Sequence, residues 1–357
     1  MYKVKNFYDR IDEIAPFKSA YNWDNCGLLI GSMENEVHKV LFSLDVTENV
    51  VEYAVKEKID LIISHHPVIF QPQKSISQKK LLTLIENKIS VISAHTNLDV
   101  SKYGVNFVLA ETLGLQDIMA LSMSSDIAQY QISVYTPFEH LDNVMSAMHK
   151  AGAGIIGNYS HCATYFETCG QYTPLENSKP FQGTQGQLEK TKEMKLEVVC
   201  EEIYLSSVLK VMFEAHPYET PAYTVIPLKQ SSPNYGLGCH GVLSETMQIK
   251  SFSIYVKERL KAPFVKLWLA GQKDDFKVKK VALCGGSGNS IIHDAKQKAD
   301  VFVSSDFTYH QLLDAPLPVI DAGHFYTENL MMPRLRELFS DFECEMIMKE
   351  DFNLEIL

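Results

Sequence analysis

The chain has 357 residues, and its 44 acidic and 33 basic side chains give a net charge of −11 with His neutral. Hydrophobic residues make up 46% of the chain and charged residues 22%, which is a globular composition and excludes disorder as the main state. The longest apolar runs, such as 61–63 and 301–303, are far too short to span a membrane, which excludes an integral membrane protein.

The seven cysteines form no CxxC pair, and the N-terminal residues carry charges without an apolar segment. An odd number of thiols in a chain with no visible signal peptide indicates reduced cysteines in a cytoplasmic protein. The excess of acidic residues argues against non-specific nucleic-acid binding, which depends on Lys and Arg, but it excludes neither a local basic groove nor binding of metal cations.

The first third of the chain alternates short apolar runs with amphipathic segments. Strands are predicted at 40–44, 61–63 and 90–94, with a helix through 50–55 that either Thr47 or Asp45 can cap. Strand–helix–strand order with short connections predicts parallel pairing, and therefore an α/β layer.

The middle of the chain, from about residue 130 to 228, has a different order of predicted elements. Strands and helices follow one another as β-α-β and again as β-α-β, separated by a polar stretch at 171–184. This order is typical of a ferredoxin-like α+β domain. We therefore expect an inserted domain at 128–230, between two halves of a discontinuous core at 1–127 and 231–357.

The last third repeats the theme of the first. Strands are predicted at 280–284, 301–303 and 319–320, and a tight turn at the Gly-Gly-Ser-Gly segment 285–288 precedes a helix through 291–295. Aligned on their strands, the first and last thirds form a weak internal repeat. The predicted fold class is therefore α/β, a duplicated discontinuous α/β core with an inserted ferredoxin-like domain.

The repeat places polar residues at the ends of corresponding strands. His65 and His66 fall opposite Ser305 and Asp306, and the pair His95 and Asp99 falls opposite the pair His324 and Glu328. Ligands of open α/β sheets bind at the carboxyl ends of the strands. A duplicated unit would bring these side chains to one crevice.

These side chains form the ligand set of a transition metal, because imidazole combined with carboxylate suits Zn, Fe, Mn, Co or Ni. Each motif alone has a structural alternative: a His that bonds the backbone, Asp99 as a helix cap, or Glu328 as a surface acid. Taken together, five or six ligands are too many for one tetrahedral ion. They suit two ions about 3.5–4 Å apart that share a bridging carboxylate and water.

Three further segments are weaker candidates. Asp306 and His310 follow the strand that corresponds to the one before His65, and either could face a substrate or support a ligand. The Gly-Gly-Ser-Gly segment could hold an anion at a helix N-terminus, although a plain turn is the simpler interpretation. Asp24, in the segment 21–27, could orient a ligand or organise a turn.

The chain resembles the NIF-like (interacting-factor-like) family, also labelled GTP cyclohydrolase 1 type 2 homologues. The matching segments are NWDNCGLLIG at 22–31, SHHP at 64–67, HTNLD at 95–99 and GHFYTE at 323–328, together with AGAGIIGNYSHC at 151–162 and AHPYETPAY at 215–223. The resemblance implies a dinuclear metal centre on His65, His66, Asp99, His324 and Glu328. It also implies a toroidal homohexamer of two trimers and a PII-like (CutA-like) insert.

We expect a metal-dependent hydrolase with two divalent metal ions per chain, acting on a nucleotide-like or phosphoester substrate. Glu328 is the expected bridge between the ions, and His95 is the expected proton shuttle or hydrogen-bond donor. The alternative is a metal storage, delivery or sensing protein without turnover, because a simple hydrolase has no need of an inserted domain that could bind a small effector.

Overall fold

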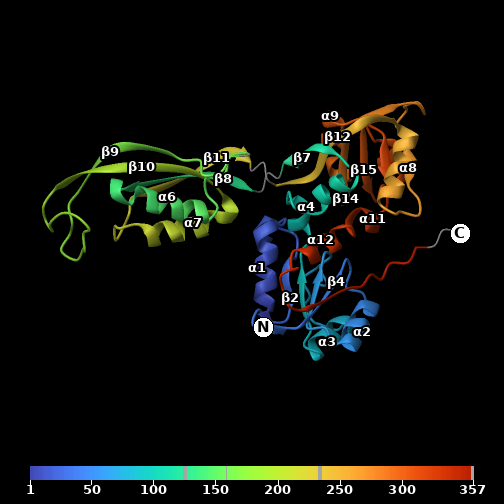
Figure 1. Ribbon diagram of the computed structural model, residues 1–357, viewed down its shortest axis with the longest axis horizontal. Coiled ribbons are helices and arrows are strands. Elements are labelled where there is room, and N and C mark those ends of the chain that lie inside the picture. The colour runs from blue at the N-terminus through green and yellow to red at the C-terminus, as the bar shows by residue number, and fades with distance from the viewer. Residues whose placement is uncertain (124–126, 158, 232–234, 355–357) are drawn as a thin grey trace. The chain divides into compact units, whose positions relative to one another are not determined.

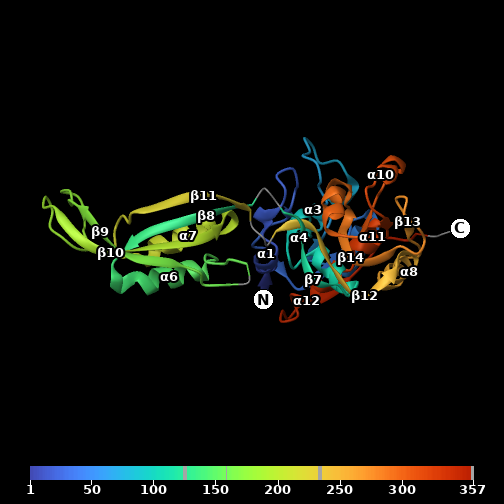
Figure 2. The same cartoon turned by 90° about the horizontal axis from the view of Figure 1, so that it is seen from above.

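The computed structural model describes residues 1–123, 127–157, 159–231 and 235–354. The chain divides into two compact units, the first made of Met1–Ser124 with Asn234–Leu357 and the second of Ser125–Pro233. Figures 1 and 2 show the second unit as one continuous stretch of chain, coloured green to yellow. Within the described residues, no helix is long and apolar enough to cross a membrane.

The first unit contains a sheet with the strand order β17-β4-β5-β6-β2. Its strands are β2 (Gly27–Ile30), β4 (Lys39–Ser43), β5 (Leu61–Ser64), β6 (Ser90–Ser93) and β17 (Glu345–Met348), beside a small pair of β1 (Tyr2–Lys3) and β3 (Glu36–Val37). Strands β4, β5 and β6 pair in parallel, as the strand–helix–strand order predicts. Strand β17, which was not predicted, adds a further parallel strand beside β4, and β2 adds an antiparallel edge.

Helices cover both faces of this sheet, which explains why its central strands are apolar throughout. The helices of this part of the unit are α1 (Val4–Ile14), η1 (Phe17–Ser19), α2 (Glu48–Glu57), α3 (Lys79–Glu86) and α12 (Met331–Glu337). Val40 and Phe42 pack in one core with α1 and α12, whereas Leu41 points to the opposite core with α2 and α3. The Thr47 hydroxyl caps α2 by accepting a hydrogen bond from the Val50 amide.

The second sheet of this unit has the order β13-β16-β15-β14-β12-β7. Its strands are β7 (Gln116–Met123), β12 (Gly236–Gln248), β13 (Lys266–Trp268), β14 (Lys277–Ser287), β15 (Val301–Ser305) and β16 (Val319–Asp321). The three central strands β14, β15 and β16 pair in parallel. The turn expected at 285–288 is wrong for residues 285–287, because β14 continues to Ser287 after an irregularity in its register.

The remaining helices of the first unit complete a repeated arrangement. They are α4 (Thr96–Val100), α5 (Val105–Thr112), α8 (Ile249–Arg259), η3 (Asn289–Ile291), α9 (Ile292–Lys298), α10 (Tyr309–Leu313) and α11 (His324–Glu328). The order β4-α2-β5-α3-β6-α4 in the first half matches β14-α9-β15-α10-β16-α11 in the second. In both halves, the third parallel strand therefore leads directly into a one-turn helix.

The second unit is a four-stranded antiparallel sheet with the order β11-β8-β10-β9. Its elements are β8 (Ala128–Thr136), η2 (Phe138–His140), α6 (Leu141–Lys150), β9 (Thr164–Tyr172), β10 (Glu189–Glu201), α7 (Glu202–Ala215) and β11 (Tyr223–Ser231). Val144 of α6 and Val208 of α7 share one core with Ile132 and Leu196 of the sheet, so both helices cover the same face. Figure 1 shows this two-layer arrangement.

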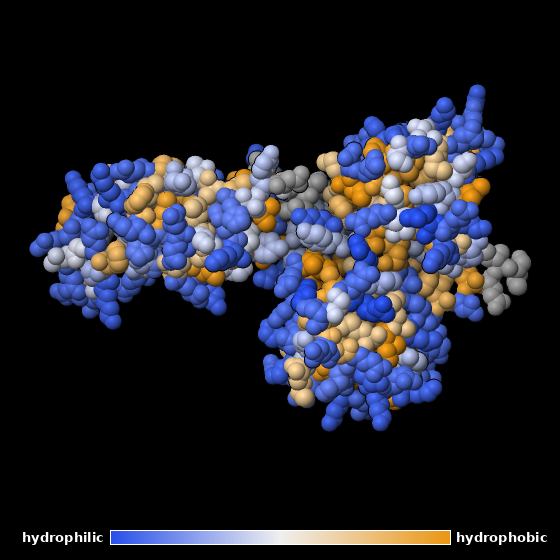
Figure 3. All heavy atoms as spheres, viewed as in Figure 1, coloured by the Kyte–Doolittle hydropathy of each residue, from blue (hydrophilic) through white to orange (hydrophobic). Residues whose placement is uncertain are grey.

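The surface is mixed in character. On the face drawn in Figure 3, hydrophilic residues separate the hydrophobic residues of both units into small groups. Scattered apolar residues of this kind are normal on a folded protein. Exposed aromatic side chains therefore indicate a binding site only where several of them lie beside charged or metal-ligating groups.

Candidate metal centre

Six side chains from three segments of the first unit lie close together. They are His65 and His66 after β5, His95 and Asp99 of the segment that begins α4, and His324 and Glu328 of α11. The ligand atoms fall into three overlapping groups, each within 4.8 Å: His65, His66 and His95; His66, His324 and Glu328; and His65, Asp99 and Glu328. The structure thus brings together every candidate ligand that the sequence suggests.

Local backbone geometry explains how a sheet presents these residues. Strand β5 ends at Ser64, and His65 and His66 lie in the bend between the strand and Pro67, so their side chains need not alternate across the sheet. One turn of helix places Asp99 four residues after His95 and Glu328 four residues after His324, on one face each. Gly323, with φ of +81°, permits the sharp turn from β16 into α11.

All four imidazoles are oriented by a hydrogen bond that Nδ1 donates. His65 donates to the Ala94 carbonyl at 2.8 Å and His66 to Asp45 at 2.8 Å. His95 donates to Asp24 at 2.9 Å, and His324 donates to Asp306 at 2.5 Å. Imidazoles that ligate metals are commonly fixed in this way, because the bond at one nitrogen directs the other.

The Nε2 atoms of His65, His66 and His324 lie close to two carboxylates. Oε2 of Glu328 lies 2.9 Å from Nε2 of His324, 3.1 Å from Nε2 of His66 and 3.9 Å from Nε2 of His65. Oδ1 of Asp99 lies 3.6 Å from Nε2 of His65. Glu328 is therefore the central carboxylate of the cluster.

This donor set fits a divalent metal ion. Four of its buried atoms have no hydrogen-bond partner: Nε2 of His65, Oδ1 of Asp99, Nε2 of His324 and Oε2 of Glu328. A neutral Nε2 and a carboxylate oxygen are both acceptors, so contacts this short need a proton or a cation between them. Imidazole and carboxylate ligands together favour transition metals.

Burial and neighbouring charges divide the imidazoles into two kinds. Complete burial lowers the pKa of His65 to about 3, so this ring is neutral and ready to ligate. Burial also acts to lower the pKa of His66 and His324, but the adjacent carboxylates outweigh it: Asp45 and Glu328 raise the pKa of His66 to about 10, and Glu328 and Asp306 raise that of His324 to about 9. Without metal, protons on these two rings neutralise the buried carboxylate.

The two carboxylates shift in opposite directions. Burial, followed by the charge of Glu328, raises the pKa of Asp99 to about 7. Burial acts in the same direction on Glu328, but the adjacent imidazoles of His324 and His66 outweigh it, so the pKa of Glu328 lies well below its usual range. Glu328 is thus the permanent anion of the centre.

Gly286 makes room for the central carboxylate. A Cβ at this position would collide with Oε1 of Glu328 and lie 3.0 Å from Nε2 of His324, and the backbone φ is +59°. The Gly286 amide donates to the Thr327 hydroxyl, and its carbonyl accepts from Ser304 and Ser305. The end of β14 is therefore a fixed wall of the centre.

Exposed aromatic rings lie beside His95. Trp23 is 62% exposed and Phe70 is 46% exposed, and their ring centroids are 6.1 Å apart. Each lies within 6.4 Å of the His95 ring, and Tyr21 stacks on Trp23 at 5.8 Å. These rings offer apolar faces to a molecule bound at the centre.

Asp24 connects the aromatic rings to the cluster. Its carboxylate accepts hydrogen bonds from His95, from Thr96 and from the Cys26 thiol. These bonds outweigh the effect of burial and hold the pKa of Asp24 well below its usual range. Burial and Asp24 raise the pKa of Cys26 to about 12, so this thiol stays protonated. Asp24 therefore orients His95 and does not merely organise a turn.

Of the two weaker candidates that follow β15, only Asp306 contacts a residue of the cluster. Asp306 holds His324, whereas His310 is exposed on α10 and belongs to none of the three ligand groups. Sequence reasoning missed the role of Asp45, which it offered only as a possible helix cap, and the role of Gly286. The position of Asp45 just beyond β4 was the available signal for the first.

Three comparisons identify related proteins. A family model described as Duf34/NIF3 (NGG1p interacting factor 3) matches residues 2–355. The GTP cyclohydrolase 1 type 2 homolog of Bacillus subtilis is 40% identical over 329 residues, covering 90% of this chain and 87% of that protein. The protein of the same name from Halalkalibacterium halodurans is 37% identical, covering 90% and 88%.

Solved structures match over nearly the whole chain. The Bacillus cereus protein related to NIF3 has a TM-score of 0.86 at 35% identity, covering 99% of this chain and 98% of its own. The Staphylococcus aureus protein SA1388 has a TM-score of 0.73 at 29% identity, covering 99% and 97%. Reduced HcgD from Methanocaldococcus jannaschii, at 22% identity and a TM-score of 0.58, shares the fold.

Proposed function

The chain belongs to the Duf34/NIF3 family, and from this premise we propose that it is a metal-dependent hydrolase with a dinuclear centre. The observation that carries the proposal is the close approach of three Nδ1-anchored imidazoles to two carboxylates, each of which has one buried oxygen without a hydrogen-bond partner. The substrate class that we propose is a nucleotide-like molecule or a phosphoester.

The three ligand groups support two metal ions rather than one. His65, Asp99 and Glu328 would hold one ion, and His66, His324 and Glu328 the other, with Glu328 shared between them. The position of Glu328 Oε2 near three imidazoles supports this bridging role. When bound, such a pair of cations supplies Lewis-acid chemistry, which polarises substrate oxygens and lowers the pKa of water.

His95 is the proposed proton carrier. Asp24 accepts the hydrogen of Nδ1, so Nε2 of His95 presents a lone pair toward the centre. This nitrogen can take a proton during attack and return it to a leaving group. Its membership of the group with His65 and His66 supports a place beside the reacting atoms.

The exposed aromatic rings of Trp23 and Phe70 favour a substrate with a flat ring. A planar heterocycle can stack on Trp23 or Phe70 while its phosphate or ring atoms reach the metal centre. The name of the curated relatives, GTP cyclohydrolase 1 type 2 homolog, makes GTP the first nucleotide to test.

The decisive experiment combines metal analysis with turnover. The purified chain is loaded separately with Zn, Fe, Mn, Co and Ni, and is assayed against nucleotides and small phosphoesters. We expect metal-dependent hydrolysis that falls by at least about 100-fold in His66→Ala, since a metal ligand contributes more than the 10–100-fold typical of its supporting residues. The exposed His38→Ala is the matched control and should retain activity.

Two results would count against hydrolysis. A folded, metal-loaded chain that turns over none of these substrates contradicts the proposed activity. If that chain also transfers its metal to an apo acceptor, the alternative of metal storage or delivery replaces it.

We also propose that the second unit is an inserted ferredoxin-like, PII/CutA-like domain at 128–230 and that six chains assemble as a ring of two trimers. The β-α-β-β-α-β order and the strand order β11-β8-β10-β9 support the first part. Light scattering on the purified chain tests the second, and a mass below that of six chains contradicts it.

A further inference from the structure

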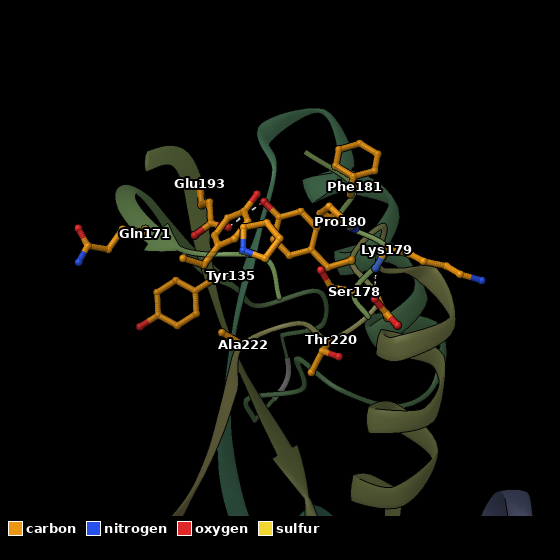
Figure 4. A pocket seen from close by; sticks show the side chains of 14 residues that line it. Tyr135, Gln171, Ser178, Lys179, Pro180, Phe181, Glu193, Thr220 and Ala222 are labelled. Carbon is orange, nitrogen blue, oxygen red and sulfur yellow. Dashed lines mark hydrogen bonds between the residues drawn. The ribbon is translucent and has the colours of Figure 1, made fainter. Parts of the chain in front are cut away.

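The second unit contains a cavity that the metal centre does not use. It encloses about 450 Å³ and is lined by side chains of β8, β9, β10 and the segments that follow β9 and α7 (Figure 4). Cavities of this size hold small molecules in proteins. All of its lining residues belong to the second unit.

The walls of the cavity are aromatic. Tyr135, Tyr172, Phe181 and Tyr218 line it. The Tyr218 ring centroid lies 6.0 Å from that of Phe181 and 6.5 Å from that of Tyr172, so the rings gather around one space. Aromatic faces carry negative electrostatic potential and attract cations.

A buried carboxylate stands among these rings. Glu193 is only 8% exposed, and its Oε1 accepts a hydrogen bond from the Tyr218 hydroxyl at 2.8 Å. Its Oε2 lies over Gly170, also a lining residue, where any Cβ would collide with it. Burial and the nearby Glu193 raise the pKa of Tyr218, so the hydroxyl keeps the proton that it donates.

This carboxylate has no cationic partner within the part of the chain that the structure describes. The neighbouring lysines of β10 pair elsewhere, Lys192 with Glu167 and Lys195 with Glu197. Lys179 lines the cavity, but Figure 4 shows its side chain extending away from Glu193. A buried anion without a counter-ion is costly, and a bound cation would remove that cost.

A second acid and a fixed loop complete the site. Glu219 also lines the cavity, where its carboxylate accepts a hydrogen bond from the Lys179 amide. His216 donates from Nε2 to the Tyr135 carbonyl and accepts at Nδ1 from the Tyr218 amide. The AHPYET segment of the sequence thus holds Tyr218 in place, a role that the metal centre does not explain.

We propose that this cavity binds a small organic cation, in which an ammonium, amidinium or guanidinium group is carried on a flat or apolar body. Glu193 would pair with the charged group through Oε2. The rings of Phe181, Tyr172 and Tyr218 would contact both the cation and its apolar body.

The test uses the full chain and probes of one shape with different charges. Benzamidinium, neutral benzamide and anionic benzoate are titrated by isothermal calorimetry, with 2-phenylethylammonium as a second cation. We expect both cations to bind, benzamidinium at least about tenfold more tightly than benzamide through its pairing with a carboxylate, and benzoate not to bind.

Substitutions test whether the probes bind in this cavity. Glu193→Gln should weaken benzamidinium binding at least about tenfold, and Phe181→Ala, at a half-exposed ring, about threefold to fivefold. Glu214→Gln removes an exposed carboxylate of α7 that does not line the cavity, and it should leave the affinity unchanged. If Glu193→Gln does not fold, the comparison of benzamidinium, benzamide and benzoate on the unaltered chain, together with Phe181→Ala, still tests the proposal.

Three outcomes overturn the proposal. One is the absence of binding by either cation. Another is benzoate or benzamide binding as tightly as benzamidinium. The last is benzamidinium binding that survives in Glu193→Gln but disappears in Glu328→Gln, which would assign it to the metal centre.

Discussion

At the scale of single residues, three aspartates and one carbonyl orient the imidazoles of the centre. Asp45 is the member of this set that sequence reasoning offered only as a cap, and it accepts the hydrogen of His66 Nδ1. Because it contacts an imidazole of the cluster on the side away from Glu328, its expected role is to position a candidate ligand.

Asp45→Asn tests this role. The amide can still accept one hydrogen bond but carries no charge, so we expect metal affinity to fall about 10–100-fold, as for other residues that support a ligand. Competition with a metal-sensitive dye measures the affinity. Asp9→Asn, at an exposed position of α1, is the control, and equal affinities of the two variants would contradict the assignment.

The imidazoles also predict a pH dependence of the metal-free chain. Folded-state pKa values of about 10 for His66 and about 9 for His324 exceed the unfolded value near 6.5. The contribution of these groups to the free energy of unfolding is therefore complete below about pH 6.5 and is lost as the pH rises through 9 to 10.

Thermal melts of EDTA-treated protein between pH 6.5 and 9.5 check this expectation. The Tm of the metal-free chain should fall across the range, and added metal should reduce the fall because cations replace the lost protons. A metal-free Tm that rises over this range contradicts the pKa shifts.

Residue identity and spacing were enough to select the candidate ligands, but not every contact around them. His and acid residues four positions apart at strand ends are visible in one dimension. The contact of Asp45 with His66 and that of Gly286 with Glu328 join segments 21 and 42 residues apart, as numbered along the chain. Such contacts depend on how strands pair, which the sequence does not specify locally.

At the scale of elements, parallel strands were the easiest to predict because buried strands are continuously apolar. The predicted ends were less accurate. Strand β9 runs from Thr164 to Tyr172 and so enters the polar stretch that was expected to begin at 171, and its partner β10 runs from Glu189 to Glu201. Most residues of β9 are exposed, so backbone pairing with β10 holds them without a hydrophobic pattern.

The structure at the end of β14 predicts how one methyl group added at Gly286 affects metal binding and stability. In Gly286→Ala, the added Cβ needs the space of Glu328 Oε1 and a positive φ that alanine disfavours. We expect a loss of metal affinity of at least about tenfold and a destabilisation of about 1–3 kcal/mol.

Denaturant unfolding and metal titration measure these two effects. The matched control is Gly271→Ala, which has a positive φ of +78° but nothing within 4 Å of the added Cβ. Gly271→Ala should cost stability without affecting metal binding. Equal metal affinity in the two variants would show that the Gly286 wall does not shape the centre.

At the scale of the whole molecule, the two compact units predict separable roles. Met123 of β7 and Gly236 of β12 are paired neighbours in one sheet, so a short linker can replace residues 125–233. We expect this deletion variant to bind the same amount of metal per chain as the full chain, because all six side chains of the centre lie in the first unit.

Elemental analysis of both proteins after identical loading checks the expectation. A folded deletion variant that binds no metal would show that the second unit contributes to the centre. The alternation of predicted elements was sufficient to anticipate a separate middle segment. The strands β7 and β17 were not anticipated, because edge strands are identified by their partners rather than by their own pattern, and the internal strand β12 was not anticipated either.

The division of the centre between the two halves of the first unit has a consequence for biosynthesis. His65 and Asp99 leave the ribosome before His324 and Glu328, which lie more than about two hundred residues further along the chain. A nascent chain therefore carries an incomplete set of donors through most of its synthesis. If the centre binds metal as proposed, chains terminated before His324 should bind less metal than the full chain, because they lack two of the six donors.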